Sequence, residues 1–208
     1  MSKTAIILAG GVSRRFGQDK GLISLAGKPL VMHVFEKACL VAEELIVVVG
    51  SATQRDLYLP LFPKGTKIVV DAEELRSPLV GALSGFTSAG GDYSVLLPCD
   101  TPFVSKEVMD LLFHVAPNMD AVIPRWPNAY IEPLQAVYRT SSTLRAAQEA
   151  LDKGEVRLLP MIMLLKKVRY ISTMVIQEIN PRLTTFFNIN TPTDLRRAEN
   201  LIKRSTVM

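Results

Sequence analysis

The chain has 208 residues, of which 48% are hydrophobic, and its formal net charge is +4. This length and composition predict one globular domain spanning residues 1–208. The 24 basic residues are scattered, so no basic arm for nucleic acid is predicted. The 2 cysteines are too few for a disulfide framework, and no apolar stretch approaches the roughly 20 residues that cross a bilayer. We therefore expect a soluble, cytoplasmic protein without nucleic-acid or membrane partners.

Short apolar runs rich in β-branched residues alternate along the chain with segments of helical periodicity. The predicted strands are TAIIL (4–8), LIVVV (45–49), KIVV (67–70), YSVLL (93–97), AVI (121–123) and LQAVY (134–138). The spacing of apolar residues predicts helices over 31–38 and 108–115. Apolar strands separated by helices predict a three-layer α/β/α fold, in which a Rossmann-like, mostly parallel sheet is covered on both faces.

The last predicted helix has the clearest start. Thr191 is the expected N-cap, Pro192 the first helical residue and Asp194 the third, an arrangement that resembles a capping box. An apolar stripe follows at helical spacing, formed by Leu195, Ala198 and Ile202. Met161 and Met163, on a shorter apolar segment, are expected to fill core space.

Ligands of such sheets bind beyond the carboxyl ends of the strands. The first predicted strand runs into AGGVSRRFGQDK, which has the spacing of neither a P-loop nor a Rossmann fingerprint. Glycines let a backbone approach an anion closely, and Arg14, Arg15 and Lys20 offer donors to a polyphosphate. An ordinary glycine turn with solvated charges is the alternative. A second AGG, at residues 89–91, has no basic residues behind it and is expected to end a helix.

Two aspartates follow other predicted strands. Asp100 lies in PCDTPF after YSVLL, between prolines that restrict the backbone. A rigidly held carboxylate can bind Mg²⁺ together with substrate phosphates, although an aspartate in a turn can also bond to backbone amides. Asp71, after KIVV, is more simply explained by a strand that runs into a helix cap.

Several ordered segments resemble a known family. LAGGVSRRFGQDK with LAGKPLVMHV resembles the opening motif of nucleotidyltransferases with the nucleotide-diphospho-sugar transferase fold, and of the molybdenum cofactor guanylyltransferases in particular. The similarity continues through SPLVGALSGF (77–86), LPCDTPF (97–103), IEPLQAVY (131–138) and FFNINTPTDL (186–195). It therefore covers nearly the whole chain.

The resemblance implies transfer of GMP from GTP to the phosphate of molybdopterin, with release of pyrophosphate. It assigns Leu8, Ala9 and Gly10 to the guanine and ribose, and Asp71 to the nucleotide. Transient contact with proteins that donate or accept the cofactor is also implied. Magnesium would be the metal cofactor.

Three charged residues carry the implied chemistry. Asp100 would bind Mg²⁺, Lys20 would contact the phosphates, and Lys20 with Arg15 would stabilise negative charge during transfer. No nucleophilic side chain is needed, because the attacking phosphate is already ionised near neutral pH. Positioning and electrostatics are therefore expected to carry the catalysis.

Two positions depart from the family pattern. Phe16 replaces the usual methionine, and Ser77 stands where a glycine usually precedes Pro78, near the expected base pocket. A transferase that uses CTP or another phosphorylated acceptor is therefore the alternative enzyme. A carrier that binds nucleotide or pterin without turnover is the alternative from another class, and the presence of both Lys20 and Asp100 argues against it.

Further residues have two readings each. Asn188 and Asn190 either form a turn ahead of the last helix or bring one amide near the metal or acceptor phosphate. Trp126 and Tyr130, in PRWPNAY, either stack on a pterin or cover the core. His33 and His114 are expected to be partly exposed or locally bonded side chains and not metal ligands.

Overall fold

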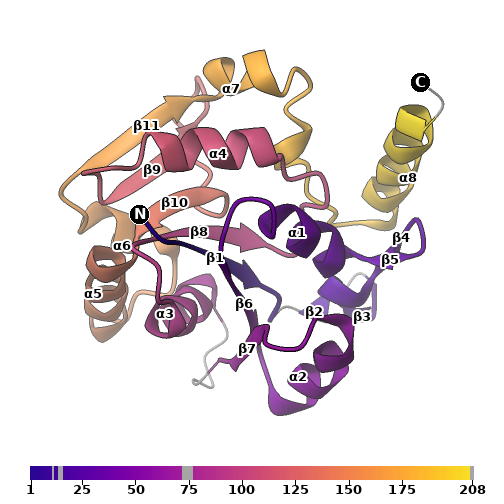
Figure 1. Cartoon of the computed structure of the whole chain (residues 1–208), viewed down its shortest axis with the longest axis horizontal. Helices are drawn as coiled ribbons and strands as arrows, with labels where there is room; N and C mark the ends of the chain where they lie inside the picture. The colour runs from indigo at the N-terminus through magenta and orange to yellow at the C-terminus, as the bar shows by residue number, and fades with distance from the viewer. Residues whose placement is uncertain (11, 14–15, 72–76, 207–208) are drawn as a thin grey trace.

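A computed structural model describes residues 1–10, 12–13, 16–71 and 77–206, and its centre is a seven-stranded sheet with helices on both faces (Figure 1). The strands are β1 (Lys3–Leu8), β6 (Glu44–Val49), β7 (Lys67–Val70), β8 (Tyr93–Pro98), β9 (Ala121–Arg125), β10 (Ala136–Arg139) and β11 (Val168–Ser172). Their order is β11-β9-β10-β8-β1-β6-β7. In this sheet β10 runs antiparallel to both neighbours and the other pairs are parallel. The predicted three-layer, mostly parallel fold is confirmed.

Two sets of helices cover the two faces. One face carries α1, α4 and α7, and the other carries α3, α5 and α6 (Figure 1). The helices are α1 (Leu30–Ala38), α2 (Ala52–Tyr58), α3 (Pro78–Ser88), α4 (Lys106–His114), α5 (Thr140–Asp152), α6 (Leu158–Met163), α7 (Thr173–Ile179) and α8 (Pro192–Thr206). Among the described residues, none of these helices combines the length and apolar character needed to cross a bilayer.

The central strand β1 is buried on both sides. Ala5 and Ile7 belong to the apolar cluster under α1 and α4, whereas Ile6 belongs to the cluster under α3 and α5. Successive side chains of a strand point to opposite faces, so one continuous apolar run supplies both layers. This explains why the strand shows no alternation with polar residues.

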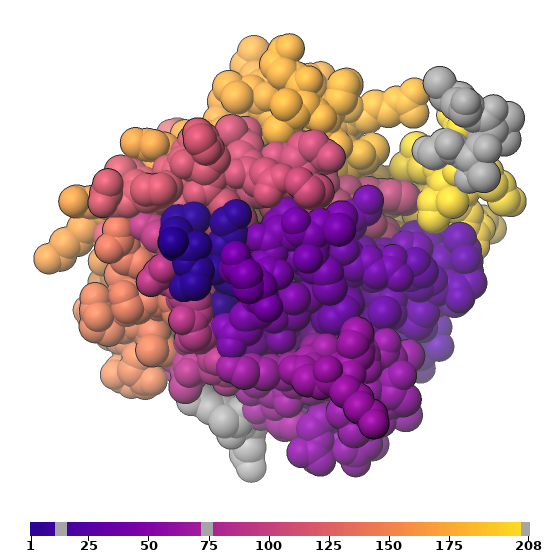
Figure 2. All heavy atoms as spheres, viewed as in Figure 1, coloured from indigo at the N-terminus to yellow at the C-terminus, as the bar shows by residue number. Residues whose placement is uncertain are grey.

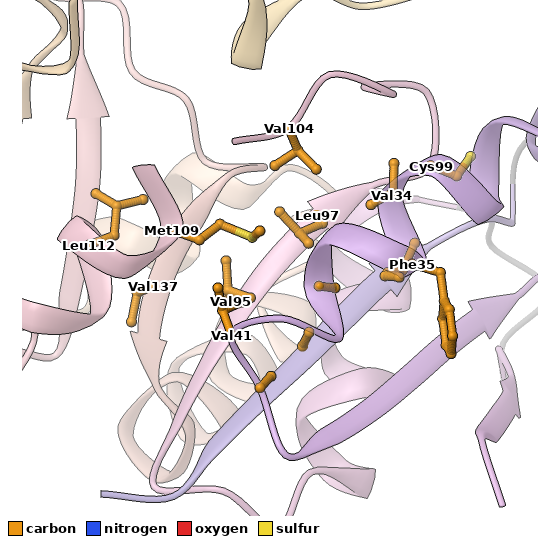
Figure 3. Close-up of a cluster of buried hydrophobic side chains, with 14 of the residues drawn as sticks. Val34, Phe35, Val41, Val95, Leu97, Cys99, Val104, Met109, Leu112 and Val137 are labelled. Carbon is orange, nitrogen blue, oxygen red and sulfur yellow. The ribbon is translucent and has the colours of Figure 1, made fainter. Parts of the chain in front are cut away.

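The first of these clusters fills the space between the sheet and its α1 and α4 layer. Figure 3 shows Val95 and Leu97 of β8 beside Met109 of α4, and Val34 and Phe35 of α1 belong to the same cluster. These side chains are almost completely buried. Full burial of each large apolar side chain stabilises the fold by about 1.5–3 kcal/mol, which holds β8 and its carboxyl end in place.

On the opposite face α3 lies unusually close to β1. A Cβ at Gly85 would lie 2.4 Å from Cγ2 of Ile6, so a side chain at this position of α3 would force the helix away from the sheet. Nearer the start of α3, a Cβ at Gly81 would lie 3.4 Å from Leu8 Cδ2, so this part of the helix lies beside the carboxyl end of β1.

The last helix begins as predicted. The Thr191 hydroxyl accepts from the Asp194 N–H at 3.1 Å, and the Asp194 carboxylate accepts from the Thr191 N–H at 2.9 Å. The predicted capping box is thus confirmed. The stripe of α8 packs against the β4 (Ser24–Leu25) and β5 (Lys28–Pro29) hairpin. Figure 2 shows the yellow surface of α8 beside that N-terminal region.

Three details differ from the predictions. β11 was not predicted, because this edge strand exposes Arg169 and Tyr170 and so lacks a continuous apolar run. β10 begins at Ala136, since Gln135 has a φ of 120° and interrupts the extended backbone. The core placement of Met163 is wrong: its side chain is 77% exposed, whereas Met161 is buried. α6 is a single short helix, and only one of its sides faces α5.

Candidate active site

A cavity of about 340 Å³ lies at the carboxyl edge of the sheet, where β1, β6, β7 and β8 end. This is where an open parallel sheet is expected to bind a ligand. The lining residues come from five separate segments of the chain: Leu8, Gly10, Lys20, Val48, Asp71, Ser77, Pro78, Gly81, Pro98, Cys99, Asp100 and Leu134. The predicted residues Leu8, Gly10, Lys20, Asp71 and Asp100 are thus brought together.

The Lys20 ammonium is held between two acceptors. It forms an ion pair with Asp100 Oδ2 and donates a hydrogen bond to Asn190 Oδ1 at 2.6 Å. Lys20 begins a short 3₁₀ helix, Lys20–Leu22, directly after β3 (Gln18–Asp19), which pairs with β2 (Val12–Ser13). Of the two asparagines considered from sequence, Asn190 therefore lies at the charged end of the cavity, and Asn188 bonds only weakly to the Phe186 carbonyl, at 3.5 Å.

Asp100 is held rigidly by its backbone. The preceding residue Cys99 donates its N–H to the Leu8 carbonyl at 3.1 Å, and the Asp100 carbonyl accepts from Ile189 N–H at 2.9 Å. The Asp100 side chain is almost fully buried, and its Oδ1 has no hydrogen-bond partner in the described part of the chain. A buried carboxylate oxygen without a donor is costly, and such an oxygen suits a metal ion or a bound ligand.

Asp71 extends the line of β7 into the cavity. Its N–H donates to the Val49 carbonyl at 2.7 Å, and its Oδ1 accepts from the Ser84 hydroxyl of α3 at 2.9 Å. A Cβ at Gly81 would lie 3.4 Å from Leu8 Cδ2 and 3.7 Å from Asp71 Oδ2. This position of α3 therefore lies close to both side chains. The contact from Ser84 orients the carboxylate.

The three consecutive residues Leu8, Ala9 and Gly10, at the carboxyl end of β1, do not all face the cavity. Leu8 and Gly10 line the cavity, but Ala9 does not. The Ala9 side chain is fully buried in the cluster under α1, and its carbonyl accepts from Gln54 Nε2 at 2.7 Å. The alternation of side chains along an extended backbone explains why neighbours in one motif face opposite sides.

The two departures from the family pattern have structural roles. Ser77 is the N-cap of α3, and its hydroxyl accepts from Val80 N–H at 3.2 Å while the residue also lines the cavity. Phe16 packs against the apolar cluster that joins the β4–β5 hairpin to α8. The predicted cations Arg14 and Arg15 lie outside the described residues.

The aromatic residues of PRWPNAY have different surroundings. Trp126 packs on Phe186 with ring centroids 5.7 Å apart and donates its indole N–H to Glu132 at 2.7 Å. Tyr130 is 60% exposed. Burial raises the pKa of Glu132 despite the hydrogen bond from Trp126. Trp126 thus covers the core, as one of its two readings had it, and Tyr130 remains available at the surface.

A polar network behind the cavity was not predicted. Asp19, which precedes Lys20, accepts hydrogen bonds from Gln54 Nε2 and from the Tyr58 hydroxyl, the latter at 2.6 Å. Burial is the main cause that raises the pKa of the Tyr58 phenol, as it does for the Cys99 thiol at the cavity wall. The only sequence signal for this network is the spacing of Gln54 and Tyr58, two side chains with polar ends that lie four residues apart on the short helix α2.

A larger hollow of about 1010 Å³ lies between α4 and α7. Its lining includes the exposed apolar side chains Met174, Val175 and Ile179, and none of the predicted site residues that the structure describes. The smaller cavity is the better candidate for chemistry, because charged and polar groups from separate segments converge on it.

Comparison with known proteins agrees with this geometry. Residues 5–166 match the MobA-like NTP transferase domain. The chain belongs to the MobA-like NTP transferase family. A relative from Methanosarcina mazei, named a probable molybdenum cofactor guanylyltransferase, is 34% identical over 96% of this chain and 90% of its own length. A molybdenum cofactor guanylyltransferase from Desulfosudis oleivorans is 32% identical over 98% of each chain.

The MobA-like fold is also found in a solved structure. Molybdopterin-guanine dinucleotide biosynthesis protein A from Archaeoglobus fulgidus superposes with a TM-score of 0.83 at 28% identity, covering 97% of this chain and 99% of that one. The superposition thus covers nearly the whole chain. The predicted family and nucleotidyltransferase fold are therefore confirmed.

Proposed function

We propose that this MobA-like protein transfers GMP from GTP to the phosphate of molybdopterin, forming molybdopterin guanine dinucleotide and pyrophosphate. The names of its relatives support this reaction. The observation that carries it is the convergence of Lys20, Asp100 and Asn190 at one end of a cavity that Leu8 and Asp71 line further along. One end thus suits phosphates and the other a nucleoside.

The transfer makes one bond and breaks one. An oxygen of the acceptor phosphate bonds to the α-phosphorus of GTP, while the bond from the α-phosphorus to the oxygen bridging to the β-phosphate breaks and pyrophosphate leaves. Two polyanions meet in this step, so charge stabilisation is the main demand on the protein. Lys20 meets that demand with its ammonium, and Arg15 is the second cation in this proposal.

Nucleoside binding is assigned to the other residues. Leu8 and Gly10 offer an apolar wall and an accessible backbone, and Asp71 offers an oriented carboxylate acceptor for nucleoside N–H or O–H donors. Ala9 contributes through its backbone, because its side chain faces the core. The acceptor would enter beside Asn190, whose amide nitrogen can donate to a phosphate while its oxygen holds Lys20.

The residues present fit a magnesium ion. Asp100 offers one buried oxygen without a partner in the described structure, and Mg²⁺ usually binds one or two carboxylates together with substrate phosphates. No group of three or more His, Cys, Asp or Glu side chains gathers among the described residues, so phosphates would have to complete the coordination. When bound, the ion would neutralise charge on the triphosphate.

The direct test is a pyrophosphate-release assay. Purified protein is incubated with Mg²⁺, molybdopterin and GTP, CTP, ATP or UTP in turn, and the dinucleotide product is identified by mass. Release with GTP that depends on molybdopterin supports the proposal. Release with CTP alone would select the cytidylyltransferase alternative, and nucleotide binding without release would select the carrier. A single domain and a cytoplasmic location stay predictions.

A further inference from the structure

The short helix α2 buries two polar side chains. Gln54 is 9% exposed and Tyr58 is completely buried, whereas the other residues of α2 are exposed. The two positions are one helical turn apart, so both face the segment that joins β1 to the rest of the cavity. A helix normally turns apolar residues inward, so the polar atoms of these two require an explanation.

The Gln54 amide spans the two ends of the glycine-rich segment. Its Oε1 accepts from Gly50 N–H at 2.6 Å, and its Nε2 donates to the Ala9 carbonyl at 2.7 Å and to Asp19 Oδ2. Ala9 lies just before this segment and Asp19 just after it. One side chain therefore fixes both the entry and the exit of the loop.

The Asp19 carboxylate is held from three directions. Besides Gln54, it accepts from the Tyr58 hydroxyl at 2.6 Å and from Gly21 N–H at 2.9 Å, both on Oδ1. Asp19 is also the N-cap of the 3₁₀ turn that carries Lys20. A Cβ at Gly21 would lie 2.1 Å from the Tyr58 hydroxyl oxygen, so this turn can approach Tyr58 only with glycine there.

We propose that Gln54 and Tyr58 are positioning residues that act through Asp19 to aim Lys20 at the phosphates. The inference rests on the proposed function, because it needs a polyphosphate in the cavity. Adjacent residues have opposite tasks: Asp19 points to α2 and does not line the cavity, whereas Lys20 lines it. The network thereby fixes the backbone that carries the ammonium and keeps the Asp19 charge away from the triphosphate. A cation set in place before the reaction stabilises charge without reorganisation.

The first variants each remove one donor while keeping side-chain size. Gln54→Glu and Tyr58→Phe should each lower kcat/KM for GTP by about tenfold or more, the effect of losing one hydrogen bond to a charged group. Binding of Mg·GTP, measured by calorimetry, should weaken as well. Tyr58→Phe introduces no new charge, so it keeps the test informative if Gln54→Glu does not fold.

Matched controls make the same chemical changes elsewhere. Gln148 on α5 donates to Asp152 at 2.9 Å at an exposed site, and Tyr93 bonds Met119 and Arg139 at the opposite end of the sheet. Gln148→Glu and Tyr93→Phe should leave kcat/KM and Mg·GTP binding within about twofold of wild type, as surface or distant changes usually do.

Two combinations separate positioning from stability. Asp19→Asn with Gln54→Glu reverses the hydrogen bond, since the new amide can donate to the new carboxylate while its oxygen still accepts from Tyr58 and Gly21. This pair should regain part of the activity lost in Gln54→Glu. When Gln54→Glu is added to Lys20→Ala, kcat/KM should fall by less than a further twofold, because both changes act through the Lys20 ammonium.

The outcomes are distinct for the two proposals. Wild-type protein that binds Mg·GTP but releases no pyrophosphate contradicts the proposed function alone, and the binding measurements then still test the network. Gln54→Glu and Tyr58→Phe that bind and turn over GTP like wild type overturn the positioning inference. The positioning inference is also overturned if Gln54→Glu lowers kcat/KM by the same factor in Lys20→Ala as it does in wild type.

Discussion

Lys20 and Asp100 lie 80 residues apart in the sequence, yet their side chains form an ion pair at the carboxyl edge of the sheet. Their side chains are only 20% and 12% exposed. Partly buried charges need compensation, so each ion keeps the other in place while the cavity holds no nucleotide. A triphosphate would offer Lys20 new acceptors, and a metal would offer Asp100 a new cation.

Lys20→Ala should lower the rate of pyrophosphate release by a factor of about 100 to 1000. This is the usual effect of deleting one donor that stabilises developing charge. The measurement is steady-state turnover with GTP and molybdopterin. Lys28→Ala is the control, since Lys28 forms an exposed ion pair with Glu36, and it should turn over normally. Near wild-type turnover of Lys20→Ala would contradict its assignment.

Asp100→Asn should raise the Mg²⁺ concentration that gives half-maximal pyrophosphate release by at least about tenfold, since even residues one step removed from a metal affect its affinity this much. The amide oxygen still accepts from Lys20, but the ammonium loses its compensating charge, so the melting temperature should fall while the variant stays folded. A magnesium titration of turnover measures the first effect and thermal unfolding measures the second, each compared with Asp110→Asn, which alters an exposed carboxylate paired with Lys106. An unchanged magnesium requirement would exclude Asp100 as the ligand.

The sequence predicted those parts of the site that follow strand ends. Leu8 ends β1, Asp71 follows β7 and Asp100 lies just beyond β8, and parallel strands bring their carboxyl ends to one edge. Their meeting in one cavity follows from topology alone. The family resemblance was needed to assign them to nucleotide and metal.

Contacts that depend on tertiary packing could not be predicted. No local pattern indicates that Asn190 meets Lys20 across 170 residues, or that Gln54 joins Ala9 to Asp19. β11 was not predicted because an edge strand with one side facing solvent needs no continuous apolar run, so its sequence carries no clear strand pattern. Periodicity reports burial, and these features depend on specific polar partners.

Ser77→Gly should preserve both stability and the preference for GTP over CTP. Glycine at an N-cap costs only a few tenths of a kcal/mol relative to serine, whereas Ser77→Ala should lower the free energy of unfolding by about 1 kcal/mol. Urea unfolding and competitive turnover with both nucleotides measure these effects. A changed nucleotide preference in Ser77→Gly would mean that the hydroxyl contacts the base as well as capping α3.

The capping box of α8 should make stability depend on pH below neutrality. The hydrogen bond from the Thr191 hydroxyl, with those from the Asn190 and Thr191 backbone, holds the pKa of Asp194 below its ordinary value of about 3.9. An acid with a depressed folded pKa stabilises the fold above its unfolded pKa, and this contribution is lost as the pH falls through the folded value.

Asp194→Asn tests this dependence. At pH 7 the free energy of unfolding of the variant should be about 0.3–1 kcal/mol lower than that of wild type, because a negative charge in the first turn stabilises a helix. The difference should shrink as the pH falls below about 4. Urea unfolding at pH 7 and pH 3 measures both values. Asp152→Asn, at the C-terminal end of α5, is the control. In the described structure Asp152 accepts only an exposed hydrogen bond from Gln148. A difference that persists undiminished at pH 3 would show that Asp194 stabilises α8 by its shape and not by its charge.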